Sequence, residues 1–515
     1  MRNSIRKMLG VVLASLLLAT FASACGSKND QAEGKESNAA PSGSSSSSPQ
    51  ESATNKDSEP LPEVTLNIVY PGDPQPDQAT VTAALEKKLA EDGINVKLKY
   101  QYIPWGDYFQ KLPIMLATGD QVDIMWTEPG LLGTFVKSNS IAPLDEALSK
   151  HGQAIVAALD KKYWPPVTVN GKKYGVPAGA LGTTKGYYTA TLRKDLREKY
   201  GLPEVKTMDD LLAYAEAVKK NNPEMIVFNE PPADFRRGEV VQSTISDGIV
   251  FNYGTKKAEA KYDRPQTLED ARFIRSLYQK GYIDKDVMVG RDIRADFNSG
   301  KAAIGGGDVY EYNNYSRNIA VEGAQVEFVK ILLTSEPYMP TTTWNFQSVA
   351  ASSKNIDRAV MFLNWIQQNE DNYDMMTNGI KGTHFDIKDG AIVAPEGVDA
   401  SKIGYAPPEW MWQNPKFLKP KASDAKDFMQ QLQDFDKDTK LFSPIMGFNF
   451  DQTPVKTELA AMSTIENKYK YGIATGVLDP ETAVPQYSKE LKKAGLEKVI
   501  AEFQKQADAF LAAGK

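Results

Sequence analysis

Two stretches of this chain place an aromatic ring beside a carboxylate at the end of an apolar, strand-like run. Trp126 and Glu128 end one such run, and Asp308 and Tyr310 follow another. An aromatic ring stacks on the flat C–H face of a sugar, and a carboxylate accepts hydrogen bonds from its hydroxyl groups. Both pairs are therefore candidates for binding a polyhydroxylated solute. The structural alternatives are a Trp126 packed beneath a helix and a tight turn before Asp308.

Residue types that drive catalysis are scarce. Two histidines, His151 and His384, and the single cysteine Cys25 cannot form a Cys/His metal cluster. Neither histidine lies in a recognisable nucleophile context. We therefore expect no metal, no cofactor and no enzyme. The alternative is a carbohydrate-active extracellular enzyme, in which Glu128 and Asp308 would flank a scissile bond.

Alternating strands and helices position these side chains. Strands are predicted at Val64–Tyr70, Val96–Ile103 and Val122–Trp126, with helices at Thr80–Leu89 and Trp105–Leu116 between them. This order predicts a parallel sheet covered by helices on both faces. Ligands of such sheets bind beyond the carboxyl ends of the strands, so the residues that follow these strands are expected at a cleft.

The rest of the chain continues this pattern and then becomes helical. Further strands are expected at residues 226–228, 302–304 and 326–333, and further helices at 209–220 (with Thr207 as N-cap), 268–280, 356–368 and 423–434. From Val455 to Ala513 the pattern is almost wholly helical, with a break near residues 472–479.

The N-terminal residues read as an export signal. Residues 1–24 run from basic to apolar to small side chains, which is typical of a secretory signal peptide. Cys25 follows directly and resembles the acylated cysteine of a bacterial lipobox, although Ala22 stands where leucine is usual. Residues 25–60, rich in Ser, Pro and Gly, are expected to form a disordered tether. The alternative is ordinary secretion with an incidental cysteine.

Four stretches together resemble the extracellular solute-binding lipoproteins of ABC importers, a family typified by sugar binders. They are Leu116–Met125, Asn170–Pro177, Phe297–Ile304 and Ser352–Trp365. Two further stretches, at residues 379–384 and 443–449, resemble a subgroup of large Gram-positive lipoproteins. Members of that subgroup share a C-terminal domain of unknown function and are assigned to oligosaccharides.

The resemblance implies an α/β periplasmic-binding-protein fold of type II-like form. Two discontinuous α/β lobes would be joined by a hinge and followed by a helical C-terminal part. The expected lobes are residues 61–180 with 334–400, and residues 181–333 with 401–515. The expected crossings lie near residues 177–185 and 326–336, with a third return between 390 and 425.

The same resemblance adds candidates for the binding site. Glu230 and Phe235 match a Glu-Pro-aromatic loop that contacts sugar in the maltodextrin binder, Trp344 follows the second crossing, and Trp410 falls where the family often stacks a ring. Trp105 reads instead as a core or capping residue. The candidate ligand-binding set is Trp126, Glu128, Glu230, Phe235, Asp308, Tyr310, Trp344 and Trp410. Alanine at Trp126 or Asp308 is expected to weaken ligand affinity with little change in melting temperature.

The resulting functional expectation is a receptor with no bond chemistry. A monomer held by its lipid on the extracellular face of a Gram-positive cell membrane would bind an oligosaccharide and deliver it to ABC permease subunits. The formal net charge of -6 gives no reason to expect nucleic acid as a partner. A peptide-binding receptor of the same fold and a sensor for a receptor kinase stay open as alternatives.

Overall fold

Two separate β-sheets form the centres of two α/β cores in the computed structural model, which describes residues 61–179, 181–232 and 238–514. The first sheet contains, in spatial order, β2 (Val96–Ile103), β1 (Val64–Pro71), β3 (Ile124–Thr127), β15 (Phe346–Val349) and β6 (Val176–Pro177). The second contains β13 (Val326–Leu332), β7 (Tyr187–Arg193), β12 (Ala302–Gly306) and β8 (Ile226–Phe228).

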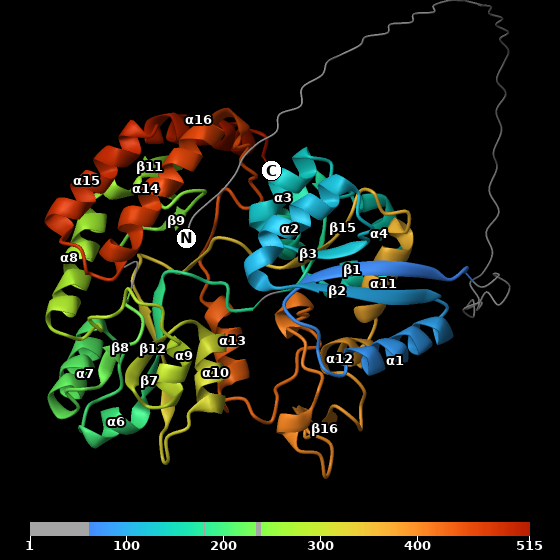
Figure 1. Cartoon of the computed structure of the whole chain (residues 1–515), viewed down its shortest axis with the longest axis horizontal. Coiled ribbons are helices and arrows are strands. Elements are labelled where there is room, and N and C mark those ends of the chain that lie inside the picture. The colour runs from blue at the N-terminus through green and yellow to red at the C-terminus, as the bar shows by residue number, and fades with distance from the viewer. Residues whose placement is uncertain (1–60, 180, 233–237, 515) are drawn as a thin grey trace, which may run out of the picture. The chain divides into compact units, whose positions relative to one another are not determined.

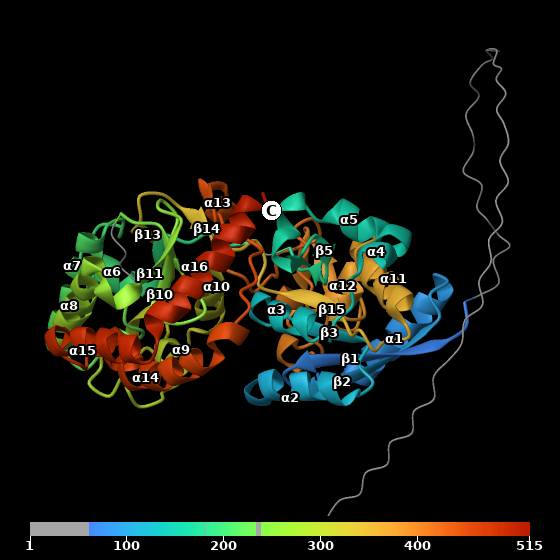
Figure 2. The ribbon, with the colours of Figure 1, turned by 90° about the horizontal axis from the view of Figure 1, so that it is seen from above.

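The first sheet is mixed rather than purely parallel. β1 pairs in parallel with β2 and β3, as the sequence predicts, whereas β15 runs antiparallel to both β3 and β6. The last four residues of β1 are all buried, as expected for a strand covered on both faces. The covering helices include α1 (Gln78–Glu91), α2 (Trp105–Thr118), α3 (Pro129–Lys137), α4 (Asp145–His151), α5 (Gln153–Ala158), α11 (Ile356–Ile366) and α12 (Glu370–Asn378). Figure 2 shows α4 beside α11 near this sheet.

The second sheet combines parallel and antiparallel pairs. β12 pairs in parallel with β8, and β7 runs antiparallel to both β12 and β13. Its helices are α6 (Lys194–Lys199), α7 (Met208–Asn221), α8 (Pro265–Gln279), α9 (Ile293–Asn298), α10 (Val309–Asn318) and α13 (Phe428–Lys437). In Figure 1, α13 lies beside α10, and Leu432 of α13 packs against Val309 of α10.

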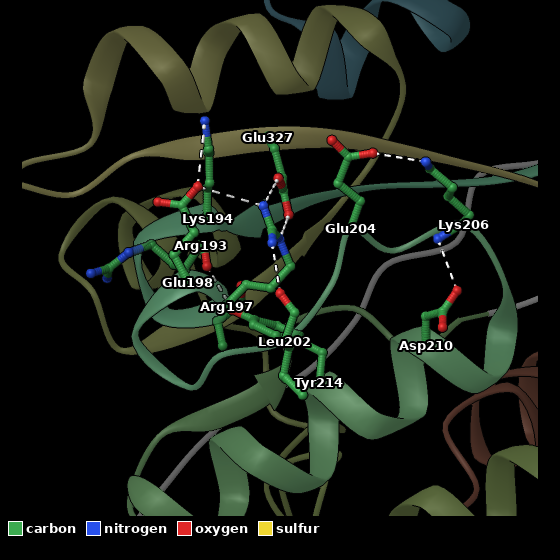
Figure 3. Close-up of polar contacts among 11 residues, drawn as sticks. Arg193, Lys194, Arg197, Glu198, Leu202, Glu204, Lys206, Asp210, Tyr214 and Glu327 are labelled. Carbon is green, nitrogen blue, oxygen red and sulfur yellow. Dashed lines mark hydrogen bonds and ion pairs between the residues drawn. The ribbon is translucent and has the colours of Figure 1, made fainter.

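Polar contacts attach α6 and begin α7 in this second core. Arg197 of α6 forms a two-pronged ion pair with Glu327 of β13, at 2.6 and 2.9 Å, and also donates to the Leu202 carbonyl (Figure 3). Thr207 and Asp210 form a reciprocal capping box at the start of α7, which confirms Thr207 as the N-cap. The ion pair attaches α6 to the edge strand β13, and the capping box satisfies backbone amides at the start of α7.

The C-terminal helices pack on a third, small sheet. This sheet contains β9 (Val241–Ser243), β10 (Ile249–Asn252) and β11 (Lys257–Ala260). Helices α14 (Lys456–Ala474), α15 (Pro480–Lys493) and α16 (Leu496–Ala512) bury Tyr487, Leu491 and Val499 against it (Figure 1, red). The predicted helical pattern and its break near residues 472–479 are confirmed. Three two-stranded pairs complete the sheets: β4 (Thr168–Val169) with β5 (Lys172–Lys173), β14 (Tyr338–Met339) with β18 (Leu441–Phe442), and β16 (Asp386–Lys388) with β17 (Ala391–Val393).

Two chain segments that cross between the cores are hydrogen-bonded to each other. The first crossing, described at residues 178, 179 and 181–186, and the second, residues 333–345, exchange hydrogen bonds between Lys185 and Tyr338 at 2.6 and 3.1 Å. Gly186 has a φ of +98°, and a Cβ there would collide with the Thr334 hydroxyl, so only glycine fits this close approach. The second crossing begins later than expected, because residues 326–332 form strand β13.

The chain returns to the second core within the expected interval of residues 390–425, but after residue 401. Tyr405, Met411, Trp412 and Phe417 belong to the first core, so the segment assigned to lobe 2 from residue 401 onward starts in lobe 1. Contacts with α10 begin at Gln413, which donates to the Tyr310 hydroxyl, and continue at Asp424, which accepts from the Asn313 side chain at 2.9 Å. The other lobe boundaries stay predictions. Among the described residues, none of the helices combines the length and apolar character needed to cross a membrane.

Candidate functional site

Trp126 is the centre of an aromatic cluster at the carboxyl end of β3. Its side chain is only 4% exposed, and its indole Nε1 donates to the Asn345 side chain at 3.0 Å. Its ring lies edge-on to Trp105 (5.4 Å between centroids) and Trp410 (6.0 Å). A ring this enclosed supports its neighbours rather than offering a face to ligand. The packing therefore favours the alternative in which Trp126 is a buried structural residue and not a ligand contact.

The rings around Trp126 supply the exposed faces. Trp105 and Phe109, one turn apart on α2, are 43% and 41% exposed, and Trp410 is half-buried against Trp105. Trp344 is 46% exposed and makes no ring contact with another described residue. It directly precedes Asn345, the residue that holds Trp126. Trp105, Phe109 and Trp410 each contact the Trp126 ring and form a supported apolar surface beside the strand ends, and Trp344 adds a separate exposed ring.

Trp412 and Glu128 flank the aromatic cluster. Trp412 is buried, with its ring edge-on to Tyr70 at 5.5 Å, so Trp410 rather than Trp412 belongs to the exposed surface. Glu128 sits just before α3, and burial raises the pKa of its carboxyl group. A partly buried carboxylate of this kind gains from hydroxyl donors that a ligand brings.

Two carboxylates lie at the carboxyl ends of β8 and β12 in the second sheet. Glu230 follows β8, and its carboxylate lies so close to Gly306 that a Cβ at that glycine would collide with it. Burial, and then the nearby Glu311, raise the pKa of Glu230. Asp308 follows β12 and caps α10, accepting hydrogen bonds from the amides of Tyr310 and Glu311 at 3.0 and 3.2 Å.

Tyr310 of α10 contacts three other parts of the chain. Its hydroxyl accepts a hydrogen bond from Gln413 Nε2 at 2.7 Å and donates to the Leu181 carbonyl at 3.4 Å. Its ring packs edge-on to Phe428 of α13 at 5.7 Å. Tyr310 thus joins α10 to the first crossing and to the segment around Gln413.

The structure therefore groups the candidates by lobe. Trp126, Glu128, Trp344 and Trp410 gather at one edge of the first sheet, and Glu230 and Asp308 gather at one edge of the second. Phe235 lies outside the described residues. No group of three His, Cys, Asp or Glu side chains within the described ranges is placed to hold a metal ion.

The sequence reading missed two exposed rings. Trp105 was expected in the core or at a cap, and Phe109 received no role. A signal for both was present: Trp105 comes two residues after β2, as Glu128 comes one residue after β3, and Phe109 comes four residues after Trp105 on the same helix face. The strand-end rule, applied to β2 as well as β3, would have found them.

Two α/β cores joined by paired crossings, with ligand-type side chains at the strand ends, define a two-lobed binding protein. The family model "Bacterial extracellular solute-binding protein" matches residues 72–373, and the chain belongs to this family. A domain of unknown function, DUF3502, matches residues 444–512. This range includes α14 to α16, the helices that pack on the third sheet.

A sequence relative agrees with this family, and solved structures share the fold. A carbohydrate ABC transporter substrate-binding protein from Streptococcus pneumoniae is 26% identical over 451 residues, covering 85% of this chain and 89% of the relative. The structure of the N-glycan transport solute binding protein NgtS, from the same species, has a TM-score of 0.76 at 24% identity and covers 88% of this chain and all of that one. Its complex with Man1GlcNAc has a TM-score of 0.69 at 24% identity, covering 87% and 99%. The expected two-lobed fold is confirmed.

Proposed function

We propose that this protein is the carbohydrate receptor of an ABC importer, binding an oligosaccharide outside the cell and delivering it to a permease. The observation that carries the proposal is the exposed aromatic surface of Trp105, Phe109 and Trp410 at the strand ends of the first lobe, with Trp344 as a further exposed ring. Carbohydrate binding by the Streptococcus pneumoniae relative, as its name states, supports the same ligand class.

The chemistry of the two lobes is complementary for this ligand class. The first lobe offers rings that stack on the apolar faces of sugars, and it adds the carboxylate of Glu128. The second lobe offers Glu230 and the free oxygen of Asp308, whose other oxygen caps α10. Carboxylates accept hydrogen bonds from sugar hydroxyl groups, and a buried acceptor left unpaired costs ~1–3 kcal/mol.

Lobe closure would follow from contacts that only the closed state makes. A sugar stacked on the first lobe gains hydrogen bonds from the second lobe when the crossings bend. The closed form then docks on the permease. No group in this scheme makes or breaks a covalent bond, and a monomer suffices for it.

A thermal-shift panel tests the ligand class. Neutral oligosaccharides at 100 times Kd should raise the free energy of unfolding of the purified protein by about 2.7 kcal/mol, and the melting temperature with it. The panel also includes a peptide pool and an assay for glycan cleavage. Stabilisation by peptides alone would favour the peptide-binding alternative, and turnover of a glycan would favour the enzyme.

Anchoring is tested separately at Cys25, which lies outside the described residues. Acylation of this cysteine would hold the protein at the extracellular face of the membrane while the tether of residues 25–60 lets the lobes reach the permease. Cys25→Ser is expected to release the protein into the culture medium with unchanged sugar affinity. Retention on washed cells, measured by immunoblot, would contradict lipid anchoring.

A further inference from the structure

The C-terminal helices are connected to the first lobe as well as to the third sheet on which they pack. The third sheet and α14 to α16 are here called the C-terminal subdomain. Residues 446–453, here called the linking segment, lie between β18 and α14 and touch the first lobe. This contact involves neither crossing, so it is a further connection between the lobes.

The C-terminal subdomain is fixed to the second lobe through α8. Arg275 of α8 donates to the Gly476 and Val477 carbonyls at 2.7 and 3.0 Å, in the turn between α14 and α15. Arg272 forms a two-pronged ion pair with Glu481 of α15 at 2.5 and 2.8 Å. Other side chains of α8 are buried in the core of the second sheet. The C-terminal subdomain is therefore expected to move together with the second lobe.

Lys137, the last residue of α3 in the first lobe, makes the charged contact with the linking segment. Its Nζ lies 2.7 Å from Asp451 Oδ1, and it also donates to the Thr453 hydroxyl. Lys137 and Thr453 lower the pKa of Asp451 to about 2, so this ion pair is charged at neutral pH. The Asp451 amide donates to Gln506 Oε1 at 2.8 Å, and its carbonyl accepts from Gln506 Nε2 at 3.1 Å. The ion pair thus joins α3 to α16.

Two glycines show how closely the linking segment approaches the first lobe. Gly447 has a φ of +80°, and a Cβ there would come within 2.5 Å of the Pro165 carbonyl oxygen. A Cβ at Gly133 of α3 would lie 3.3 Å from the Asn449 side chain. The linking segment therefore touches the first lobe at several points and not only at Lys137.

The contact is nevertheless polar, exposed and loosely packed. The Lys137 and Asp451 side chains are 52% and 45% exposed. Beside them lies a groove of about 670 Å³, lined by Trp164 of the first lobe, Phe448 of the linking segment and Phe510 of α16. Within the described ranges, no cluster of buried hydrophobic residues joins the first core to α14–α16. A contact of this kind breaks more easily than a packed core.

The conformation in which this contact forms leaves the aromatic surface uncovered. Trp105 and Phe109 keep exposed faces, so the second lobe does not cover these rings here. Closure on a ligand changes the angle between the lobes at the crossings. The linking segment begins at the second crossing, where Met446 Sδ lies 3.8 Å from the Thr342 hydroxyl, and Asp451 is five residues further on. Rotation about the crossings is therefore expected to move Asp451 relative to α3.

We propose that the linking segment is a restraint that favours the uncovered form of the receptor, through the ion pair between Lys137 and Asp451, and that closure on a ligand breaks this pair. It rests on the proposed carbohydrate-receptor function, which supplies the ligand that closes the lobes, and it gives the C-terminal subdomain a regulatory role. The restraint lowers the population of the closed form, so the apparent affinity is weaker than the intrinsic affinity of that form.

Titration calorimetry with the oligosaccharide identified by thermal shift tests the restraint. Lys137→Ala is expected to raise the apparent affinity about two- to fivefold, because an exposed ion pair that opposes closure is lost. Lys150→Ala is the matched control and should leave affinity unchanged, because the 51%-exposed Lys150 pairs with Glu146 at 2.6 Å inside the first lobe. Unchanged or weaker binding by Lys137→Ala would overturn the proposal.

Salt gives a second readout on the same two proteins. Raising NaCl from about 0.1 to about 1 M screens exposed ion pairs, so the wild-type affinity should rise toward that of Lys137→Ala. The affinity of Lys137→Ala itself should change little. An equal response of both proteins to salt would count against the ion pair as the restraint.

Spin-label distance measurements test the lobe positions without a ligand. Cysteines replace the exposed residues Ala83 of α1 and Ala213 of α7, one in each lobe, in the Cys25→Ser variant, which lacks the only native thiol. Lys137→Glu places a like charge beside Asp451 and is expected to broaden the distribution of label distances. Identical distributions with and without this substitution would refute the restraint.

The restraint and the carbohydrate-receptor function can fail independently. If no saccharide binds while Lys137→Glu broadens the distance distribution, the receptor function is wrong and the restraint on the lobes stands. If saccharides bind and neither Lys137 variant changes affinity or distance distribution, only the restraint is wrong.

Discussion

Replacing Trp126 with alanine is expected to lower the free energy of unfolding by about 3–5 kcal/mol, the range measured for large aromatic residues in protein cores. The side chain is 4% exposed and contacts the rings of Trp105, Tyr108 and Trp410. The variant also leaves the Asn345 side chain without its indole donor. Urea unfolding followed by circular dichroism measures the loss.

Trp344→Ala is the matched control, because Trp344 is 46% exposed and makes no ring contact with a described residue. Its stability should stay within about 0.5 kcal/mol of the wild type. Its affinity for the oligosaccharide identified by thermal shift should fall by about tenfold or more, because a stacking face is lost. The reverse pattern, with Trp126→Ala stable and Trp344→Ala unfolded, would show that the exposed surface is misassigned.

This pair replaces the expectation drawn from the sequence, in which alanine at Trp126 or Asp308 changes affinity and leaves stability intact. The residue types and the strand-end position are visible in the sequence. The burial of Trp126 is not, because its partner Asn345 lies more than 200 residues away, in the second crossing. Asp308 likewise has a local structural role, since it caps α10 through two backbone amides.

The features that could be predicted from the sequence are those that depend on residues close together in the chain. The bounds of β2 and β8 match the predicted strands, and the Thr207 cap depends only on a partner three residues away. Tertiary features were less accessible. The antiparallel addition of β15 to the first sheet and the packing of Phe417 in the first core depend on contacts between distant parts of the chain. Local periodicity carries no information about such contacts.

The second large effect is expected at Asp436, which holds the first crossing between the lobes. The Asp436 carboxylate, on α13, accepts hydrogen bonds from the amides of Gly182, Thr183 and Thr184 at 2.9, 3.1 and 3.2 Å. It also accepts one from the Thr184 hydroxyl at 2.9 Å. A single side chain therefore satisfies three successive amides of the first crossing, a segment that belongs to no sheet. Such charge-assisted bonds are stronger than neutral ones.

Asp436→Ala is expected to lower the free energy of unfolding by about 2–4 kcal/mol, because three amides lose their acceptor and only part of this loss is recovered by water. Asp436→Asn, which keeps one acceptor oxygen, should lose less. Asp434→Ala is the control on the same helix: its bonds to Gln430 and Lys437 are exposed, so it should change stability by less than about 1 kcal/mol. Urea unfolding of the three variants gives these values.

The same variants show whether Asp436 also controls how the first crossing bends when the lobes close. If Asp436 fixes the crossing, Asp436→Ala should also weaken the affinity for the oligosaccharide, although no candidate ligand-binding residue has been changed. The closed state needs the lobes to approach at one angle, and a loosened crossing populates that angle less often, which reduces the apparent affinity by the same fraction. Equal affinity in Asp436→Ala and Asp434→Ala, with stability lost only in the former, would limit Asp436 to folding.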